Sequence, residues 1–209
     1  MTSRFTDWSL YLVVERSLMG NRDWVDVVCA AVRGGVSVVQ LREKECSTRA
    51  FIQLAEQLLP HLRAAGVPLI INDRVDVALA VGADGVHVGQ SDMPAAQARK
   101  LLGPERLLGL SLEYKDQFYD PDITLVDYVA ASPVFATPTK TDTAPPWGLE
   151  GLRALCRVSP KPVVAIGGIN LDNAAAVRQA GAAGLAVVSA LCAAPDPEAA
   201  ARALKAAPR

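Results

Sequence analysis

Short apolar segments rich in β-forming residues recur along the chain, and each ends at residues that can bind charge. Most are continuously apolar rather than alternating, which is typical of strands buried on both faces of a parallel sheet. These segments predict eight strands, at Ser9–Val14, Val36–Leu41, Pro68–Asn72, Gly85–Gly89, Leu107–Ser111, Asp127–Ala131, Pro162–Gly167 and Gly184–Ser189.

Residues with helical periodicity fill the intervals between the strands. The clearest helix is Thr48–Ala65, which Ser47 can cap and Gly66 can end, and in which Pro60 is expected to introduce a kink or break. Glu113–Thr124 has the weakest helical pattern. The other predicted helices are Trp24–Val32, Arg74–Val81, Ala95–Leu102, Leu149–Val158, Asp172–Ala180 and Pro197–Ala206.

Eight strand–helix units in 209 residues predict an α/β protein, a single-domain (β/α)8 TIM barrel over residues 1–209 with its core at about 9–206. The alternative is an open doubly wound sheet, but no GxGxxG motif follows the first strand. The Pro- and Thr-rich segment Ser132–Gly148 is expected to form a lid or a binding loop.

Composition argues against several classes of partner. A formal net charge of −1 gives no general attraction to nucleic acid or to an anionic membrane. The first eight residues lack the apolar core of a signal peptide, and no apolar stretch reaches the about 20 residues of a membrane span. The four cysteines show neither a CxxC pair nor metal-ligand spacing, so we expect reduced thiols and a cytoplasmic protein.

The carboxyl ends of parallel strands lie at one end of a barrel, so the polar residues that follow them should converge. Gln40, Arg42 and Lys44 have the i, i+2 spacing of one strand face, and their donors suit a ligand that carries phosphate. A solvated charge cluster at the start of a helix is an equally good interpretation of these residues alone.

Asp73 and Asp92 follow adjacent predicted strands, and two carboxylates with phosphate oxygens and waters make a typical Mg²⁺ site. Asp92 can alternatively cap the helix that begins near Pro94. Asn72 can orient a substrate heteroatom or simply form a turn.

Weaker candidates come from the remaining strand ends. Ser111 can donate to a phosphate oxygen, although no neighbouring His or Lys would make it a nucleophile. Backbone N–H groups at Gly167–Gly168 and Val188–Ser189 can hold a phosphate, or these residues can be simple turns. Thr137, Thr139 and Lys140 are interpreted either as ligand contacts or as an exposed polar loop.

The two histidines give little support to histidine acid–base catalysis. His87 lies inside a predicted strand, where it can face the barrel interior but is better interpreted as a buried, hydrogen-bonded residue. His61 is expected on the outer surface of the second helix. The sequence therefore favours a site built on metal and phosphate electrostatics.

Five segments together resemble the thiamine phosphate synthase family, in the family's order, from about Leu10 to about Leu191. They are Gln40-Leu41-Arg42-Glu43-Lys44, Ile71-Asn72-Asp73, Gly85-Val86-His87-Val88-Gly89-Gln90-x-Asp92, Thr137-x-Thr139-Lys140 and Ile166-Gly167-Gly168-Ile169.

The resemblance implies a (β/α)8 barrel that uses Mg²⁺ to join two small phosphorylated substrates. These are the diphosphate of 4-amino-5-hydroxymethyl-2-methylpyrimidine and 4-methyl-5-(2-hydroxyethyl)thiazole phosphate, and the products are thiamine phosphate and pyrophosphate. The implied mechanism is dissociative: pyrophosphate leaves, the pyrimidine stabilises a methylene cation, and the thiazole nitrogen attacks it. No nucleic acid or membrane partner is implied, and a homo-oligomer is left open.

The resemblance also implies roles for individual residues. Arg42, Lys44, Ser111 and Lys140 would be catalytic, and Asp73 and Asp92 would hold Mg²⁺. The implied contacts to the pyrimidine diphosphate are Gln40, Leu41, Arg42, Glu43, Lys44, Asn72, Ser111 and Lys140. The implied contacts to the thiazole phosphate are Thr137, Pro138, Thr139, Gly168, Val188 and Ser189.

Two departures from the family pattern concern the local loop geometry and the grip on the substrate, not the pair of aspartates. The family often has a His shortly after the residue equivalent to Ser111, and Gly-Pro where this chain has Ser132-Pro133. A thiazole tautomerase-like isomerase would use His to shuttle protons, so the missing His argues against it. A non-catalytic sensor of a phosphorylated ligand on the same barrel remains the alternative from another class, and a phosphate-handling isomerase is a more distant one.

Overall fold

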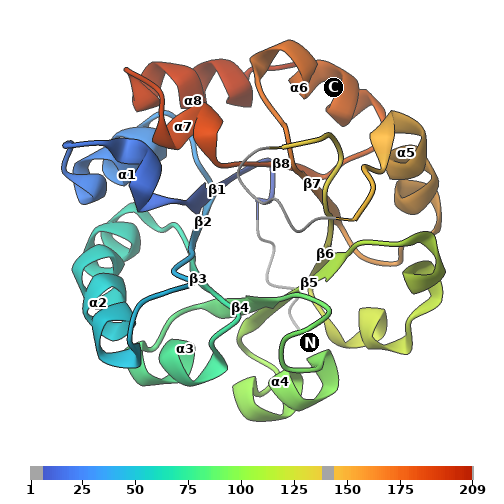
Figure 1. Ribbon diagram of the computed structural model, residues 1–209, viewed down its shortest axis with the longest axis horizontal. Coiled ribbons are helices and arrows are strands. Elements are labelled where there is room, and N and C mark those ends of the chain that lie inside the picture. Colours follow the sequence, from blue (N-terminus) through green and yellow to red (C-terminus); the bar gives the residue numbers. More distant parts are fainter. Residues whose placement is uncertain (1–6, 138–143, 209) are drawn as a thin grey trace.

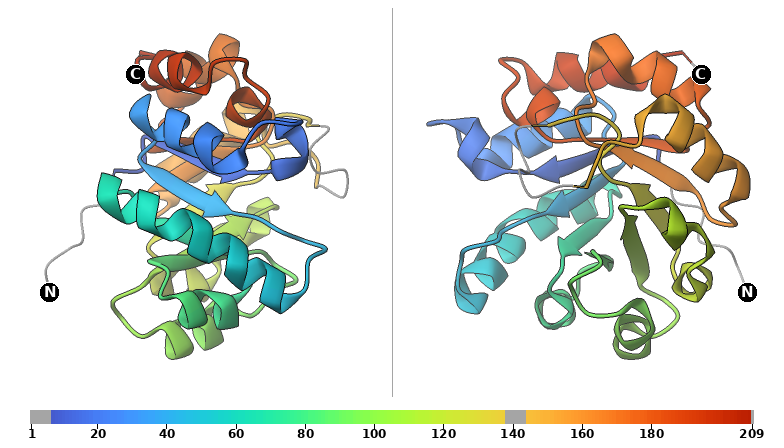
Figure 2. Two further views of the ribbon diagram at one scale, coloured as in Figure 1. Left: turned by 90° about the vertical axis from the view of Figure 1, so that its left-hand side faces the viewer. Right: turned by 45° about the vertical axis from the view of Figure 1, so that its right-hand side comes forward.

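In a computed structural model, which describes residues 7–137 and 144–208, the chain forms a closed barrel of eight parallel strands. The strands pair in sequence order, and β1 pairs with β8 to close the cylinder. A ring of helices surrounds the strands (Figure 1), and the side views show the same two layers (Figure 2). The predicted (β/α)8 TIM barrel is confirmed.

The strands are short and almost entirely buried, as their continuous apolar sequences predict. All eight predicted strands are present, with ends that differ by no more than two residues from those predicted. They are β1 (Leu10–Val14), β2 (Val38–Leu41), β3 (Leu69–Asn72), β4 (Gly85–Val88), β5 (Leu107–Leu112), β6 (Tyr128–Ala131), β7 (Val163–Ile166) and β8 (Gly184–Val187).

The helices follow the predicted pattern closely. Ser47 caps α2 by accepting a hydrogen bond from the Ala50 N–H, and the helix continues through Pro60 to a left-handed Gly66. The α-helices are α1 (Trp24–Arg33), α2 (Thr48–Ala65), α3 (Val75–Val81), α4 (Ala95–Leu102), α5 (Gly148–Val158), α6 (Leu171–Gln179), α7 (Ser189–Cys192) and α8 (Pro197–Lys205).

The segment between β5 and β6 is the main departure from the predicted helices. In place of one helix over Glu113–Thr124 it forms two 3-10 helices, η2 (Lys115–Tyr119) and η3 (Pro121–Leu125). Asp120 adopts an extended backbone between them and caps η3, because Pro121 cannot donate the hydrogen bond that would continue a helix. A further 3-10 helix, η1 (Arg16–Met19), follows β1.

Two apolar layers hold the fold together. The larger layer lies between the strands and the helices, and includes alternate strand residues such as Leu41 and Ile71. The smaller layer fills the barrel interior with side chains of the opposite alternation, including Trp8, Tyr11 and Tyr128. The Trp8 ring packs on the Tyr128 ring at 4.3 Å between centroids.

Within the described residues, no helix has the length and apolarity needed to cross a membrane. The four cysteines are free thiols, as expected from their spacing.

Gly109 on β5 makes room for polar side chains inside the barrel. It is the register partner of His87 on β4 and of Tyr128 on β6. A Cβ atom at Gly109 would overlap both the Tyr128 ring and the His87 imidazole. The missing side chain is therefore what lets these two rings approach each other.

We expect Gly109→Ala to lower the free energy of unfolding by about 1–3 kcal/mol, the usual cost of overpacking a core, as measured by urea denaturation. The matched control is Gly151→Ala in α5, where the new Cβ would lie 3.2 Å from Trp147 Cε3 and helix propensity favours alanine. Equal stabilities of the two variants would contradict this interpretation of the barrel interior.

Candidate functional site

A cavity of about 370 Å³ opens at the carboxyl ends of the strands. Residues from all eight strands and the loops that follow them line it, which is the arrangement expected of an active site on this fold. The structure brings eleven of the predicted site residues to this cavity: Gln40, Arg42, Lys44, Asn72, Asp73, Asp92, Ser111, Thr137, Gly168, Val188 and Ser189.

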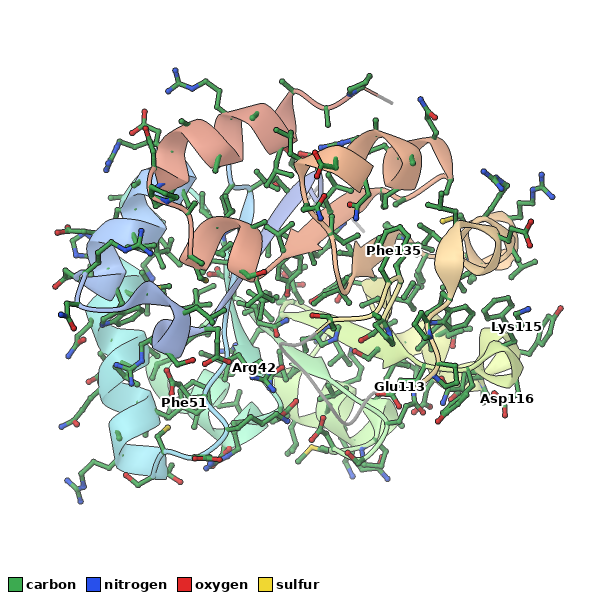
Figure 3. The ribbon with its side chains drawn as sticks, turned by 45° about the horizontal axis from the view of Figure 1, so that its top comes forward. Arg42, Phe51, Glu113, Lys115, Asp116 and Phe135 are labelled. Atoms are coloured by element: carbon green, nitrogen blue, oxygen red, sulfur yellow. The ribbon has the colours of Figure 1, made fainter. Side chains whose placement is uncertain are left out.

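Strand alternation decides which residues after β2 reach the cavity. Gln40, Arg42 and Lys44 line it, so the i, i+2 pattern persists beyond the last strand residue. Leu41 points the other way and is fully buried between barrel and helices. Figure 3 places Arg42 nearer the middle of the molecule than Phe51 of the surrounding helix α2.

Glu43 also points away from the described cavity lining. Its carboxylate accepts a hydrogen bond from Arg16 Nε at 2.5 Å, in an ion pair outside the cavity. The side chains of Leu41 and Glu43 have the opposite alternation and are not part of the described cavity lining. The ligand contacts that the resemblance implies for these two residues stay predictions.

Arg42 is held by a carboxylate that the sequence analysis missed. Its Nη1 donates to Glu15 Oε2 at 2.8 Å, and Glu15 lines the cavity. Glu15 directly follows β1, so the rule that singled out the other strand ends would have found it. Both side chains are about a quarter exposed, and a ligand can reach the pair from the cavity.

Lys44 is paired with Asp73, with 2.5 Å between Nζ and Oδ2. This contact ties the end of β2 to the end of β3 across the rim. Because the Lys44 side chain is 48% exposed, this ion pair is expected to contribute little to stability. Its cation is therefore available to exchange the carboxylate for a more highly charged anion.

Asp73 adopts a left-handed backbone, with φ at 62°. The Arg74 N–H donates to the Asn72 carbonyl at 2.7 Å, which closes a γ-turn with Asp73 at its centre. Such a conformation costs about 1–3 kcal/mol for a residue with a side chain and is concentrated at functional sites. The turn places the carboxylate on the cavity immediately after β3.

Asp92 meets Asp73 at the rim of the cavity. Its Oδ2 accepts a hydrogen bond from the Gly89 N–H at 2.8 Å, while Pro94 occupies the N-cap position of α4. Asp92 is therefore not the helix cap that was its alternative interpretation. Burial raises the pKa of Asp73, Lys44 opposes this shift, and the adjacent Asp92 carboxylate adds to it.

The two carboxylates fit a hard divalent cation. Burial first and the adjacent Asp92 carboxylate second raise the pKa of Asp73, and a bound cation would relieve both effects. Across residues 7–137 and 144–208 no group of three or more His, Cys, Asp or Glu side chains forms a metal cluster. The two carboxylates of Asp73 and Asp92 suit Mg²⁺, which is commonly held by one or two carboxylates with waters and substrate phosphates.

The floor of the cavity is polar but uncharged. His87, which is 6% exposed, hydrogen-bonds through Nδ1 to Tyr128 and through Nε2 to Ser111, both at 2.9 Å. Burial lowers the pKa of His87 to about 4, against a smaller opposing effect of Asp92, so the imidazole is neutral at physiological pH. His87 is thus buried and hydrogen-bonded, as the sequence indicated, but it also lines the cavity. The prediction that Ser111 has no neighbouring histidine was wrong, because strands β4 and β5 bring the two side chains together. His61 is exposed as expected.

The loops after β7 and β8 form another side of the cavity. Gly167 and Gly168 have φ values of 100° and 64°, and a side chain at Gly168 would overlap Phe135 and the Ala136 carbonyl. Val188 and Ser189 begin the short helix α7. Of the predicted loop contacts, Thr137 lines the cavity, whereas Pro138, Thr139 and Lys140 lie outside the described residues.

Residues 10–191 match the family model described as thiamine monophosphate synthase, which covers all eight strands. The chain belongs to this family. The match begins and ends where the motif resemblance does.

Individual proteins with thiamine-phosphate synthase names are also similar to this chain over most of its length. The chain is 58% identical to a thiamine-phosphate synthase from Albidiferax ferrireducens over 90% of this chain and 86% of the relative. It is 52% identical to one from a Roseiflexus species, over 94% of this chain and 84% of the relative. A solved structure, a thiamine phosphate pyrophosphorylase from Pyrococcus furiosus, matches with a TM-score of 0.86 and 36% identity, covering 96% of this chain and 95% of that chain.

The depressed pKa of His87 predicts a pH-dependent stability. In the unfolded chain its pKa returns to the ordinary histidine value of 6.5, so between pH 6.5 and about 4 the unfolded state binds the extra proton. We therefore expect His87 to lower the free energy of unfolding by about 2 kcal/mol as the pH falls from 7 to about 5. Above pH 7 the contribution of His87 to stability should not change with pH.

The measurement compares urea unfolding of the wild type and His87→Gln across this range. The loss on acidification should be smaller in His87→Gln, while the exposed-site control His61→Gln keeps the wild-type slope. Asp73, with a raised pKa, has the opposite sign and is common to all three proteins. Parallel curves for wild type and His87→Gln would contradict a neutral buried imidazole.

Proposed function

We propose that this protein is a thiamine-phosphate synthase, a transferase that forms a carbon–nitrogen bond and releases pyrophosphate. Its substrates are 4-amino-2-methyl-5-(diphosphooxymethyl)pyrimidine and 4-methyl-5-(2-phosphooxyethyl)thiazole. The family membership of the chain supports this activity, and the site supplies a matching set of groups.

The observation that carries the proposal is the division of the cavity into a charged rim and a neutral floor. The rim holds Arg42, Lys44, Asp73 and Asp92, and the floor holds uncharged polar groups such as Tyr128. A substrate with a neutral heteroaromatic ring and a diphosphate fits such a cavity in one orientation. Its ring lies inward and its leaving group lies at the rim.

Arg42 and Lys44 would bind the diphosphate by exchanging partners. Each now contacts one carboxylate, Glu15 or Asp73, and each can turn to the more highly charged diphosphate. Negative charge grows on the leaving group as its bond to carbon breaks, so contacts to these cations strengthen in the transition state.

Asp73 and Asp92 would hold Mg²⁺, with the diphosphate oxygens completing its ligands. When bound, the ion neutralises charge on the diphosphate and makes it a better leaving group. In this role Lys44 would break its ion pair with Asp73 and bind the diphosphate leaving group instead. The γ-turn keeps Asp73 at the rim throughout.

The floor would shelter the methylene cation that remains when pyrophosphate leaves. The cationic side chains among the described lining residues, Arg42 and Lys44, are at the rim, and His87 is neutral. Ser111 hydrogen-bonds to a neutral imidazole that is itself not a strong base, so a covalent serine intermediate is not required. Bringing the two substrates together supplies much of the acceleration.

The second substrate would bind through its phosphate at the loops after β7 and β8. Gly168, Val188, Ser189 and Thr137 line this side of the cavity and offer backbone and hydroxyl donors. On the resemblance alone, Pro138 and Thr139 join them and Lys140 contacts the diphosphate. Asn72 would orient the pyrimidine from the end of β3.

The decisive experiment mixes the two precursors with the protein and Mg²⁺ and follows pyrophosphate and thiamine phosphate. We expect both products in equal amounts, and none when either precursor or the metal is omitted. Binding of a precursor without turnover would favour a sensor. Isomerisation of the thiazole without pyrophosphate would favour a tautomerase. Either outcome would overturn the proposed reaction.

Removal of one metal ligand should lower turnover steeply. We expect Asp92→Ala to reduce kcat by about 100-fold or more at limiting Mg²⁺, with partial recovery at high Mg²⁺ because Asp73 remains. The control is Asp116→Asn on η2, an exposed acid at the periphery of the molecule (Figure 3). Unchanged kinetics of a folded Asp92→Ala at both metal concentrations would contradict the metal assignment.

A cytoplasmic location stays a prediction from the sequence. The oligomeric state, which the sequence left open, stays open.

A further inference from the structure

A continuous chain of hydrogen bonds crosses the floor of the cavity. Gln40 Nε2 donates to Tyr11 Oη at 2.8 Å, and the Tyr11 and Tyr128 hydroxyls are 2.7 Å apart. Tyr128 Oη lies 2.9 Å from His87 Nδ1, and His87 Nε2 lies 2.9 Å from Ser111 Oγ. The chain thus joins two predicted substrate contacts, Gln40 and Ser111, through three side chains that the proposed function leaves without a role.

One direction of this chain lets every hydroxyl and ring nitrogen in it use its proton. Gln40 donates an amide proton to Tyr11, and the Tyr11 proton then finds its acceptor in the Tyr128 hydroxyl, the other polar group in contact with it. The Tyr128 proton then goes to His87 Nδ1, which must be the unprotonated ring nitrogen. The neutral imidazole carries its proton on Nε2 and donates it to Ser111 Oγ.

The last proton in the sequence belongs to Ser111. Its oxygen already accepts from His87, so its own proton is available to the cavity that Ser111 lines. Rotation of the Gln40 amide by 180° would reverse every donor in the chain, and Ser111 would then donate to His87 and face the ligand only as an acceptor. The orientation of the Gln40 amide therefore determines whether Ser111 can donate a hydrogen bond to a ligand.

We propose that Tyr11, Tyr128 and His87 are positioning residues that fix Ser111 as a hydrogen-bond donor toward an acceptor atom of the pyrimidine diphosphate. This proposal rests on the proposed function for the identity of that ligand. The direction of the chain itself is a property of the free protein and does not depend on the reaction.

Burial keeps the chain in one protonation state. It raises the pKa values of the Tyr11 and Tyr128 hydroxyls and lowers that of His87, so none of the three gains or loses a proton near neutral pH. The charged group that acts on His87 is Asp92, and its effect is smaller than that of burial. The space that Gly109 leaves is occupied by the Tyr128–His87 contact.

The direct test is the tautomer of His87 in the free protein, from ¹⁵N NMR of the imidazole nitrogens. The chain has two histidines, so a His61→Gln background leaves a single imidazole to observe. We expect the Nε2–H tautomer, unchanged from about pH 5.5 to about pH 8. The Nδ1–H tautomer would show the opposite direction and would overturn the proposal, whether or not the protein makes thiamine phosphate.

Tyr128→Phe breaks the chain while keeping the ring that packs on Trp8. We expect His87 to become a mixture of tautomers, and kcat/KM for the pyrimidine diphosphate to fall about tenfold. KM for the thiazole phosphate should change less than about twofold, because that substrate meets the loops after β7 and β8. Normal kinetics in a folded Tyr128→Phe would overturn the positioning role.

Val129→Ala is the matched control, because Val129 is on the same strand but faces the helices. It should lower the melting temperature without changing the His87 tautomer or the kinetics. If Tyr128→Phe does not fold, Tyr11→Phe tests the same chain next to Gln40. It should also reduce kcat/KM for the pyrimidine diphosphate and leave KM for the thiazole phosphate nearly unchanged.

Discussion

Pairing between the first and last strands is the constraint on which the rest of the structure depends. Leu10, Tyr11 and Leu12 of β1 align with Leu185, Ala186 and Val187 of β8, and this pairing turns the sheet into a cylinder. In a cylinder, every inward side chain faces others across a short distance. Alternation along each strand therefore determines which side chains can contact one another inside the barrel. Tyr11 can reach Tyr128, far away in sequence, only because the sheet is closed.

The fold and much of the site could be predicted because both follow from local rules. Continuously apolar segments identified all eight strands, and the convergence of strand ends predicted that Asp73 would approach Asp92, as it does. The i, i+2 spacing likewise placed Gln40, Arg42 and Lys44 on one side. The resemblance treats the consecutive residues Gln40 to Lys44 alike, whereas alternation leaves Leu41 and Glu43 off the described cavity lining.

Other features depend on contacts between distant parts of the chain, which no local pattern reveals. The tyrosines at 11 and 128 resemble ordinary apolar strand residues until the closed barrel brings their hydroxyls together. The break in the segment after β5 falls at Asp120, which caps η3, and Pro121, which cannot donate a helical hydrogen bond. The γ-turn at Asp73 needs the surrounding strands to hold it, since isolated residues avoid that conformation.

The pairing of both rim cations with carboxylates has a consequence for selectivity. Among the described lining residues, the acids Glu15, Asp73, Asp92 and Glu113 outnumber the cations Arg42 and Lys44, so the site does not attract small anions in general. Inorganic phosphate would have to displace two internal partners and would meet further negative groups. A diphosphate that arrives with its own divalent counterion brings the compensation with it. On the proposed function, charge at the rim would therefore select among ligands before the shape of the cavity floor does.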